Sequence, residues 1–444
     1  MPTSSDAPIR RDIFCLLAAA LAACAGPCLG GAQSGQRPNI LFIHADDLGW
    51  SDVGCYGASH YSTPAIDALA REGLRFTQAY AGSAICTPSR AGLITGLHAA
   101  RLHTTGQPGY KTEDTAGRKF AHPNFLTTFP TNTPSIARTL TAAGYRTAIL
   151  GKWGFDDSPK DHGFAEVING PDEALVDAAL DLLAKKHSRP FFVYVNYSRP
   201  HVPLHPDPAR VAAYAARPEF GRGGRNPAYA AEVEALDRET GRLLAGLERH
   251  GLARNTVVIF GSDNGGFLGY DNERLADNSP LREGKASLYE GGIRVPLIIR
   301  WSGTIKPGTT TDVPVHWVDW HATLADLAGV KPVLLPALDG RSFAAVLRGD
   351  GSISPHPLYW HYPHYRRSMA GLSASPSSAV RNGDWKLLHF YEDDHVELYN
   401  LRDDIGELNN LALPKPDKTA AMLRQLNTWR ETIGAQPPSP NRPN

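Results

Sequence analysis

The amino-acid sequence predicts an α/β fold with a large, mainly parallel sheet sandwiched by helices, followed by a smaller C-terminal α+β subdomain with a short antiparallel sheet. Two observations predict the large unit: apolar runs alternate with helix-length segments over residues 39–332, and polar residues follow most of the apolar runs. A third observation predicts the subdomain at 333–444, where short strand-like segments precede one final helix. At 444 residues the chain is too long for one compact core, which agrees with two units.

Hydrophobic runs and helix boundary residues place the individual elements. Residues 39–44 form a continuous apolar run, which is typical of a strand buried on both faces. Thr63 and Pro64 begin a helix that Gly73 ends, and residues 74–80 form the next strand. Further strands are expected at 146–150, 190–197, 256–260 and 297–301, and further helices at 135–143, 172–186, 229–250 and 319–328. The subdomain is expected to contain strands at 358–362, 385–391 and 396–401 and a helix at 418–432.

Residues 1–25 are predicted to be a signal peptide. Arg10 and Arg11 precede an apolar run at 13–25 that is too short to span a bilayer, and they suit twin-arginine export and ordinary export alike. The sequence Leu-Ala-Ala-Cys, which ends at Cys24, matches a bacterial lipoprotein box with an acylated cysteine; cleavage after Ala25 is the alternative. Residues 26–38 form a linker. We therefore expect an exported protein, in the periplasm or anchored to the outer membrane through Cys24.

Charge and cysteine content argue against several classes of protein. Lys plus Arg number 45 and Asp plus Glu number 45, so no basic excess indicates nucleic acid as a partner. The sequence contains no apolar run that is long enough to predict a transmembrane helix. The five cysteines do not form a disulfide framework, because two are tied to the export segment and one to the chemistry below. They are Cys15, Cys24, Cys28, Cys55 and Cys86, of which Cys55 is expected to be a free packing residue.

Residues 82–96 centre on Cys86-Thr87-Pro88-Ser89-Arg90 and are the most distinctive stretch of the chain. Pro88 suits the first turn of a helix, so Cys86 is expected just ahead of a helix N-terminus. The free amides of that helix end, its dipole and Arg90 all favour an anion such as a sulfate or phosphate ester. Taken alone, a Cys-Thr-Pro triplet is also typical of an inert, buried cysteine.

Acidic residues follow two of the predicted strands. Asp46 and Asp47 come after residues 39–44, and Asp263 with Asn264 comes after residues 256–260. Adjacent carboxylates repel one another unless a cation lies between them, although such pairs also occur in solvated loops. Ligands of open α/β sheets bind beyond the carboxyl ends of the strands, and hard oxygen donors of this kind suit Ca²⁺ or Mg²⁺. The pattern therefore indicates a candidate cation site.

The stretch Cys-x-Pro-x-Arg followed by Ala-Gly-Leu-Ile-Thr-Gly resembles the signature of the type I sulfatases, arylsulfatase-like members of the alkaline phosphatase superfamily. The resemblance extends from Asn39 into the C-terminal part, where Glu397-Leu398-Tyr399-Asn400-Leu401 and Gly406-Glu407 are similar to the family's pattern. It implies an alkaline-phosphatase-like fold. It also implies that a maturation enzyme oxidises Cys86 to formylglycine, whose hydrate attacks sulfur with one hydroxyl and ejects sulfate through the other.

The resemblance also implies roles for individual residues. Asp46, Asp47, Asp263 and Asn264 match the positions that, with the modified Cys86, hold the family's divalent cation, normally calcium.

A further set matches the family's catalytic positions. Arg90 matches the arginine that orients the hydrate, and Lys152 and Lys285 match the lysines that hold the sulfate. His201 matches the histidine that protonates the leaving alcohol, which a group with a pKa near neutrality can do.

Gly154 departs from the family pattern. The family commonly reads Gly-Lys-Trp-His, and that histidine takes a proton when sulfate is eliminated, whereas this chain reads Gly-Lys-Trp-Gly. Elimination would then need water or another base, or turnover would be slow or absent. His44, His103 and His162 are the candidate replacements.

The sequence therefore predicts a Ca²⁺-dependent sulfuric ester hydrolase that acts on a sulfated carbohydrate or an aryl sulfate. The alternatives are a phosphate or phosphonate monoester hydrolase with the same site, and a non-catalytic protein that binds sulfated glycans. The aromatic run at residues 359–365, Tyr-Trp-His-Tyr-Pro-His-Tyr, is suited to stack on a sugar ring or to pack the small sheet on the large unit.

Overall fold

The computed structural model describes residues 37–109, 115, 117–222, 225–270, 273–331, 337–351, 353–367 and 373–441. The signal segment expected at 1–25, with Cys24, and the expected linker up to residue 36 lie outside the described residues. The expected boundary between the two units, at residues 332–333, also lies outside them. In the part of the chain that is described, no helix is both long enough and apolar enough to cross a membrane.

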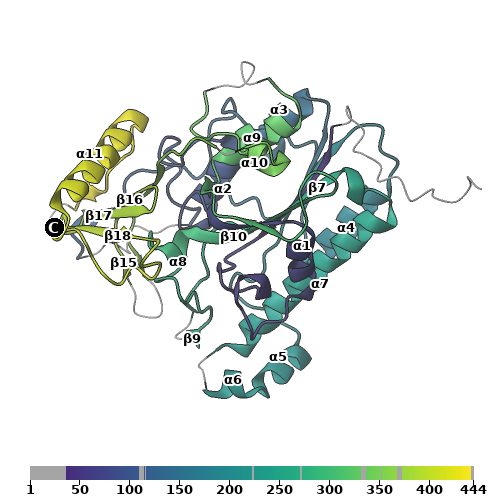
Figure 1. Ribbon diagram of the computed structural model, residues 1–444, viewed down its shortest axis with the longest axis horizontal. Helices are drawn as coiled ribbons and strands as arrows, with labels where there is room; N and C mark the ends of the chain where they lie inside the picture. The colour runs from purple at the N-terminus through teal and green to yellow at the C-terminus, as the bar shows by residue number, and fades with distance from the viewer. Residues whose placement is uncertain are drawn as a thin grey trace, which may run out of the picture. The chain divides into compact units, whose positions relative to one another are not determined.

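A large mixed sheet forms the centre of the described chain (Figure 1). Its strands are β1 (Asn39–Ala45), β2 (Leu74–Tyr80), β4 (Arg146–Gly151), β5 (Glu166–Ile168), β6 (Phe191–Asn196), β7 (Thr256–Ser262), β10 (Arg294–Trp301), β11 (Thr309–Thr311) and β12 (Val315–His316). The order is β11-β2-β10-β7-β1-β6-β4-β5, and β12 pairs with β2. The pairs are parallel except those of β10, which runs antiparallel to both β2 and β7. The predicted mainly parallel sheet is confirmed.

Helices cover both faces of this sheet because successive side chains of a strand point to opposite faces. In β1, Leu41 and Ile43 face one core, and Ile40 and Phe42 face the other. The first core is covered by α1 (Pro64–Glu72), α4 (Asp172–Ala184), α5 (Pro208–Ala215) and α7 (Pro227–Arg249). The second is covered by α2 (Cys86–Thr95), α3 (Ile136–Ala142), α9 (Asp319–Leu327) and α10 (Ala344–Arg348). In Figure 1, α3, α9 and α10 lie at the top, α4 lies at the right, and α1 and α7 lie just right of the centre.

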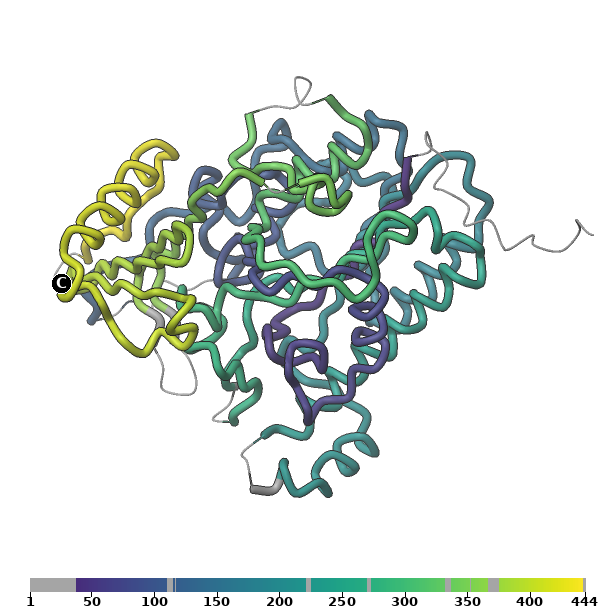
Figure 2. Tube along the Cα trace, viewed as in Figure 1, coloured from purple at the N-terminus to yellow at the C-terminus, as the bar shows by residue number. Residues whose placement is uncertain are grey.

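A four-stranded antiparallel sheet forms the C-terminal part, at the left of Figure 2. Its order is β13 (Leu358–Tyr362), β16 (Ser377–Asn382), β17 (Trp385–Phe390) and β18 (Val396–Asn400). One face packs through Trp360 and Tyr362 against Tyr80 and Ile85 of the large unit. The other face packs against α11 (Pro416–Ile433). The predicted small antiparallel sheet is confirmed, including a final helix.

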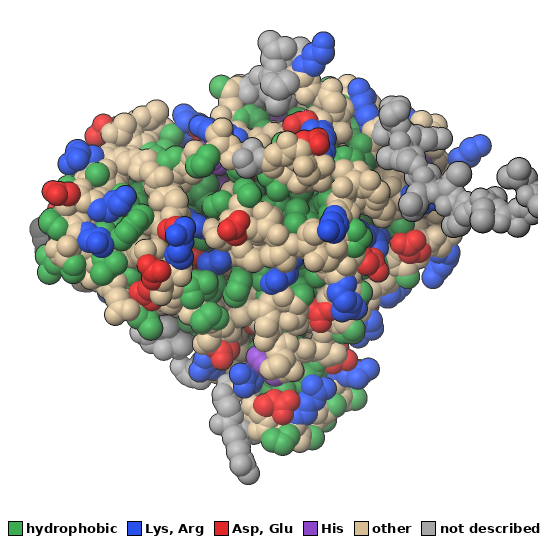
Figure 3. Space-filling view, in the orientation of Figure 1, with side chains coloured by type: hydrophobic (Ala, Val, Ile, Leu, Met, Phe, Trp, Pro, Cys, Tyr) green, Lys and Arg blue, Asp and Glu red, His purple; other side chains and the backbone are tan. Residues whose placement is uncertain are grey.

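Short elements complete the described chain. They are the strand pairs β3 (Phe120–Ala121) with β19 (Ser439–Pro440), β8 (Gly269–Tyr270) with β9 (Glu273–Arg274) and β14 (Arg366–Arg367) with β15 (Ser373–Ala374), the helices α6 (Pro218–Arg222) and α8 (Glu290–Ile293), and the 3₁₀ turns Gly54–Tyr56, Pro159–His162 and Ala253–Asn255. On the face seen in Figure 3, basic and acidic side chains are interspersed.

The structure differs from the sequence prediction at the start of α2. The helix begins at Cys86 itself, after an extended N-cap at Ile85 with φ −138° and ψ 160°, and not two residues later at the proline. The aromatic run at 359–365 is mainly interior, since Trp360, Tyr362 and Tyr365 are buried. Packing of the small sheet on the large unit is therefore the role that the structure assigns to these aromatic rings.

Candidate active site

The candidate site residues meet at the carboxyl edge of the parallel strands. Asp46 and Asp47 follow β1, Lys152 follows β4, His201 follows β6, and Asp263 with Asn264 follows β7. Helix α2 brings Cys86 and Arg90 to the same edge, and the segment before α8 brings Lys285. These residues converge because the parallel pairing of β1 with β6 and β7 aligns the carboxyl ends of the three strands.

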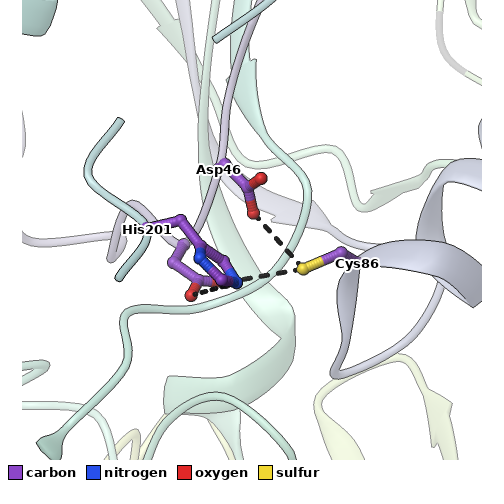
Figure 4. A group of neighbouring side chains, drawn as sticks. Asp46, Cys86 and His201 are labelled. Carbon is purple, nitrogen blue, oxygen red and sulfur yellow. Dashed lines mark hydrogen bonds and ion pairs between the residues drawn. The ribbon is translucent and has the colours of Figure 1, made fainter. Parts of the chain in front are cut away.

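Cys86 lies at the centre of the group, in the first turn of α2. Its thiol donates to Asp46 Oδ1 at 3.3 Å and lies 3.8 Å from Asp47 Oδ1, and Lys285 Nζ donates to its sulfur at 3.3 Å. Figure 4 shows the Cys86 sulfur facing the side chains of Asp46 and His201. Burial and the nearby carboxylates of Asp263 and Asp46 raise the pKa of the Cys86 thiol far above its usual range. The thiol is therefore protonated at neutral pH and is a poor nucleophile.

The carboxylates are interlocked with the loop that follows β7. The amide of Asp47 donates to Asp263 Oδ1 at 3.1 Å, and Asn264 Nδ2 donates to Asp47 Oδ1 at 2.8 Å. Asp47 has a φ of 65°, a left-handed conformation that is uncommon for a residue other than glycine. Burial opposes ionisation of Asp47, but Lys285 and His201 outweigh it and lower the pKa of this carboxyl. Asp47 is thus held as a carboxylate that faces Cys86.

Three cations balance the three buried carboxylates. Arg90 Nε donates to Asp263 Oδ2 at 3.0 Å, and its Nη1 donates to Asn196 Oδ1 at 2.7 Å. Lys285 Nζ lies 2.6 Å from Asp47 Oδ2, and Lys152 Nζ pairs with Asp46. The side chain of Lys285 is 1% exposed, whereas that of Lys152 is 29% exposed. Lys152 therefore marks the side from which a ligand can enter.

His201 lies at the same open side. Its side chain is 29% exposed, and its Nε2 lies 3.6 Å from Asp47 Oδ2, while Nδ1 contacts the carbonyl of Val202. Burial is the main cause that lowers the pKa of His201, so its protonated ring is a stronger acid than a free histidine. The adjacent Arg199 anchors this loop, because its carbonyl accepts from the amide of Asp46 at 3.0 Å.

The donor atoms of this group fit a metal site. One donor atom from each of Asp46, Asp47, Cys86 and His201 lies within 4.8 Å of the others. Asn264 Oδ1 is buried and has no hydrogen-bond partner among the described residues, although its amide nitrogen is fully used. A carbonyl oxygen left over beside carboxylates is the donor set that Ca²⁺ or Mg²⁺ prefers.

Gly154 has a φ of 89°, and a Cβ at this position would lie 3.6 Å from Arg90 Cδ and 3.7 Å from Thr87 Oγ1. The backbone conformation therefore favours glycine, and an added Cβ would make ordinary van der Waals contacts there.

None of the three candidate replacement histidines has a described hydrogen bond to Cys86. His44 contacts the Tyr194 hydroxyl at 2.7 Å, and burial lowers its pKa to about 3. His162 pairs with Asp157 at 2.6 Å. The backbone carbonyl of His103 accepts from Leu126.

Sequence reasoning missed Asn196 and Glu232 as supports of the site. Asn196 ends β6, and its side-chain oxygen accepts a hydrogen bond from Arg90. Glu232, on α7, forms an ion pair with Arg199 at 2.6 Å. Asn196 was detectable, because it is a polar residue at the carboxyl end of a buried strand, as Asp46 is. Glu232 lies within a long helix and has no such signal.

Comparison with known proteins agrees with this geometry. The family model described as sulfatase matches residues 38–330, and the model described as N-sulphoglucosamine sulphohydrolase, C-terminal, matches residues 284–432. A sulfatase of Formosa agariphila is 31% identical over 91% of this chain and 91% of its own. Human arylsulfatase A is 30% identical over 89% of this chain and 87% of its own. The crystal structure of Ps i-CgsB in complex with k-i-k-neocarrahexaose superposes with a TM-score of 0.74 at 28% identity, covering 89% of this chain and 93% of that one.

A parallel sheet edge that gathers a buried cysteine, three carboxylates and three cations is suited to the binding and hydrolysis of an anionic ester. The chain belongs to the sulfatase family, within the alkaline phosphatase superfamily, and is a sulfuric ester hydrolase.

Proposed function

We propose that this chain releases sulfate from a sulfated carbohydrate or an aryl sulfate, with Cys86 converted to formylglycine and a calcium ion held beside it. The observation that carries the proposal is the placement of Cys86, whose sulfur is within 3.8 Å of two carboxylate oxygens and 3.3 Å from a lysine ammonium. A protonated thiol at that place has little reactivity, whereas a hydrated aldehyde supplies a hydroxyl nucleophile and a second hydroxyl for the elimination of sulfate.

Asp46, Asp47, Asp263 and Asn264 would hold the calcium ion together with the modified Cys86. In support, their side chains are fully buried, and Asn264 contributes an oxygen with no other described partner. The three carboxylates are already neutralised by three cations, so a bound divalent ion makes the site net positive. Such a charge attracts a sulfate ester and opposes the charge that develops on its oxygens.

The remaining residues bind the ester and move one proton. Lys152 and Lys285 would donate charge-assisted hydrogen bonds to the sulfate oxygens. Arg90 would orient the nucleophile. His201 Nε2, at the open side, would give its proton to the leaving alcohol. With Gly154 at the position of the family histidine, a water molecule would accept the proton of the elimination step.

A sulfated carbohydrate is the substrate class that we favour. Ps i-CgsB, at 28% identity over most of both chains, is described with a bound neocarrahexaose. The aromatic run at 359–365 contributes nothing to this preference, because it is mainly interior.

We also propose that the protein is exported, from the signal-like residues 1–25. Cell fractionation tests this, and labelling with a fatty-acid analogue distinguishes acylation of Cys24 from cleavage after Ala25. Retention of the uncleaved chain in the cytoplasm would contradict export.

Mass spectrometry of the tryptic peptide 76–90 is the experiment that tests the proposed function, on protein made in a host with the maturation enzyme. We expect an aldehyde in place of the thiol, with release of inorganic sulfate from p-nitrophenyl sulfate. Phosphate and phosphonate monoesters serve as competing substrates; faster turnover of these would favour the other hydrolase class. Full modification without any sulfate release would indicate a binding protein.

A further inference from the structure

A buried ion cluster joins the C-terminal sheet to the catalytic loops. Lys386, on β17, places its Nζ 2.9 Å from Glu290 Oε1 and 2.8 Å from Glu407 Oε1, and all three side chains are 0% exposed. Glu290 begins α8, and Glu407 follows β18 in the C-terminal part. A lysine from the small sheet thus pairs with one carboxyl group of each unit.

Glu407 holds both ends of the segment 282–290, which carries Lys285. Its Oε2 accepts from the amide of Glu290 at 2.6 Å, and its backbone carbonyl accepts from Arg282 Nη1 at 2.9 Å. The segment is closed on itself, because the amide of Gly291 donates to the carbonyl of Arg282 at 2.9 Å. The position of Lys285 therefore depends on where Glu407 and Glu290 are fixed.

The same segment is locked to the loop that carries the proposed metal ligands. The amide of Gly265 donates to the carbonyl of Gly292 at 2.9 Å, and the amide of Lys285 donates to the carbonyl of Gly266 at 3.1 Å. A displacement of segment 282–292 would therefore also move residues 263–266. The chain of contacts runs from Lys386 to Glu290, to Gly292 and Gly265, and so to Asn264.

The electrostatics make Lys386 the least replaceable part of this cluster. Glu290 has other cationic and hydroxyl partners, namely Arg294 at 3.2 Å and the Tyr80 hydroxyl at 2.6 Å. Among the described residues, Lys386 is the cation that forms an ion pair with Glu407. Burial and the nearby Glu290 raise the pKa of Glu407 to about 7 against the attraction of Lys386. Without Lys386, Glu407 would lose the cation that favours its charged form, and the buried Glu290 and Glu407 side chains would have to rearrange, either by protonation of Glu407 or by moving apart.

We propose that Lys386 is a positioning residue for sulfate ester hydrolysis, which fixes segment 282–292 through Glu290 and Glu407 and so keeps Lys285 and the metal-ligand loop in place. The inference rests on the proposed function for its catalytic consequence, and on the contacts alone for its structural one.

Lys386→Met tests this, because methionine keeps most of the side-chain volume and removes the charge. Its control is Arg430→Met, which removes a cation of α11 whose partners, His389 Nδ1 at 3.0 Å and the Tyr391 hydroxyl at 2.6 Å, belong to the C-terminal part. Hydrogen exchange, calcium titration calorimetry and the kinetics of p-nitrophenyl sulfate hydrolysis are measured well below the unfolding temperature of each variant. Formylglycine content is matched by mass spectrometry.

For Lys386→Met we expect faster amide exchange confined to peptides that cover 282–292 and 263–266, weaker calcium binding, and a kcat that falls about tenfold or more. Arg430→Met should leave these three quantities near those of the unaltered protein. Wild-type exchange and kcat in a folded Lys386→Met, or the same losses in Arg430→Met, would overturn the proposal.

If Lys386→Met does not fold, Glu407→Ala takes its place, because it removes the link to Glu290 while the Lys386–Glu290 pair remains. The same increase in exchange would support the proposal, and its absence would overturn it. An unaltered protein that releases no sulfate would refute the proposed function, while the exchange data would still decide the structural role of Lys386.

Discussion

Gly265 and Gly291 pack backbone against backbone: a Cβ on Gly265 would lie 1.8 Å from the carbonyl oxygen of Gly291. This contact sets the separation between the loop after β7, with Asp263 and Asn264, and the segment that carries Lys285. Glycine is needed at position 265 because of this approach.

Gly265→Ala is therefore expected to push the two loops apart. The overlap should lower the free energy of unfolding by about 2 kcal/mol or more, measured by urea denaturation, and should weaken calcium binding in a titration. Gly241→Ala, in the middle of α7, is the control, since its Cβ would meet only the Ala65 methyl at 3.1 Å. Equal, small effects of both variants would show that position 265 tolerates a Cβ and that glycine is not required there.

Cys86→Ala should abolish sulfate release while the fold is kept, because only a thiol at the start of α2 is removed. Circular dichroism and a sulfate-release assay measure the two parts of this prediction. Cys55→Ala is the matched control, as Cys55 is the other free cysteine of the described residues and lies half-buried outside the site. Activity retained by Cys86→Ala would refute the proposed nucleophile.

Asp46→Ala combined with Asp263→Ala should remove the bound calcium, since two of the proposed oxygen ligands are lost. Metal analysis of the purified variant measures this, and Asp52→Asn should keep its calcium because Asp52 contacts Tyr229 and Gly49 and none of the proposed ligand side chains. Undiminished calcium in the double variant would show that the ion binds elsewhere.

The buried carboxyl of Asp52 should make stability depend on pH. Burial raises its pKa to about 6 from an ordinary value of 3.8, with a further contribution from Asp277, and the Tyr229 hydroxyl and Gly49 amide only partly oppose this. The folded state holds the proton more tightly, so stability falls as pH rises from about 4 to about 6, by on the order of 3 kcal/mol. Asp52→Asn should stabilise the protein at pH 7 and have little effect below pH 4, as measured by urea denaturation. A difference that is the same at both pH values would contradict the shift.

His201→Gln should slow hydrolysis of a sugar sulfate by about a hundredfold or more, because an alkoxide leaves poorly without a proton. Hydrolysis of p-nitrophenyl sulfate should fall much less, since a nitrophenolate needs little protonation. Steady-state kinetics with both substrates measure the ratio, and equal losses would mean that His201 binds the ester without protonating it.

The sequence allowed much of this architecture to be predicted because its strands are continuous apolar runs. Residues 39–44 and 256–260 could be recognised as buried strands, and the polar residues that follow them could be expected at one sheet edge. The antiparallel direction of β10 could not be recognised, because a strand buried on both faces has the same composition in either direction.

The supports of the site were the least predictable part. Lys386 lies between Trp385 and Leu387 in β17, where a lysine would ordinarily face solvent, yet it is buried by partners that are distant in sequence. The aromatic run at 359–365 left two interpretations open, because rings that stack on sugars and rings that pack between sheets have the same composition.

Under the proposed function, the burial of Cys86 also constrains when its thiol can be oxidised. Its residue is 3% exposed, and Lys285, which closes over its sulfur, lies 199 residues further along the chain. An enzyme that carries out the proposed oxidation has to reach this buried thiol. We therefore expect the oxidation to precede the folding of the later segment over Cys86, and a molecule that folds without it to keep its thiol.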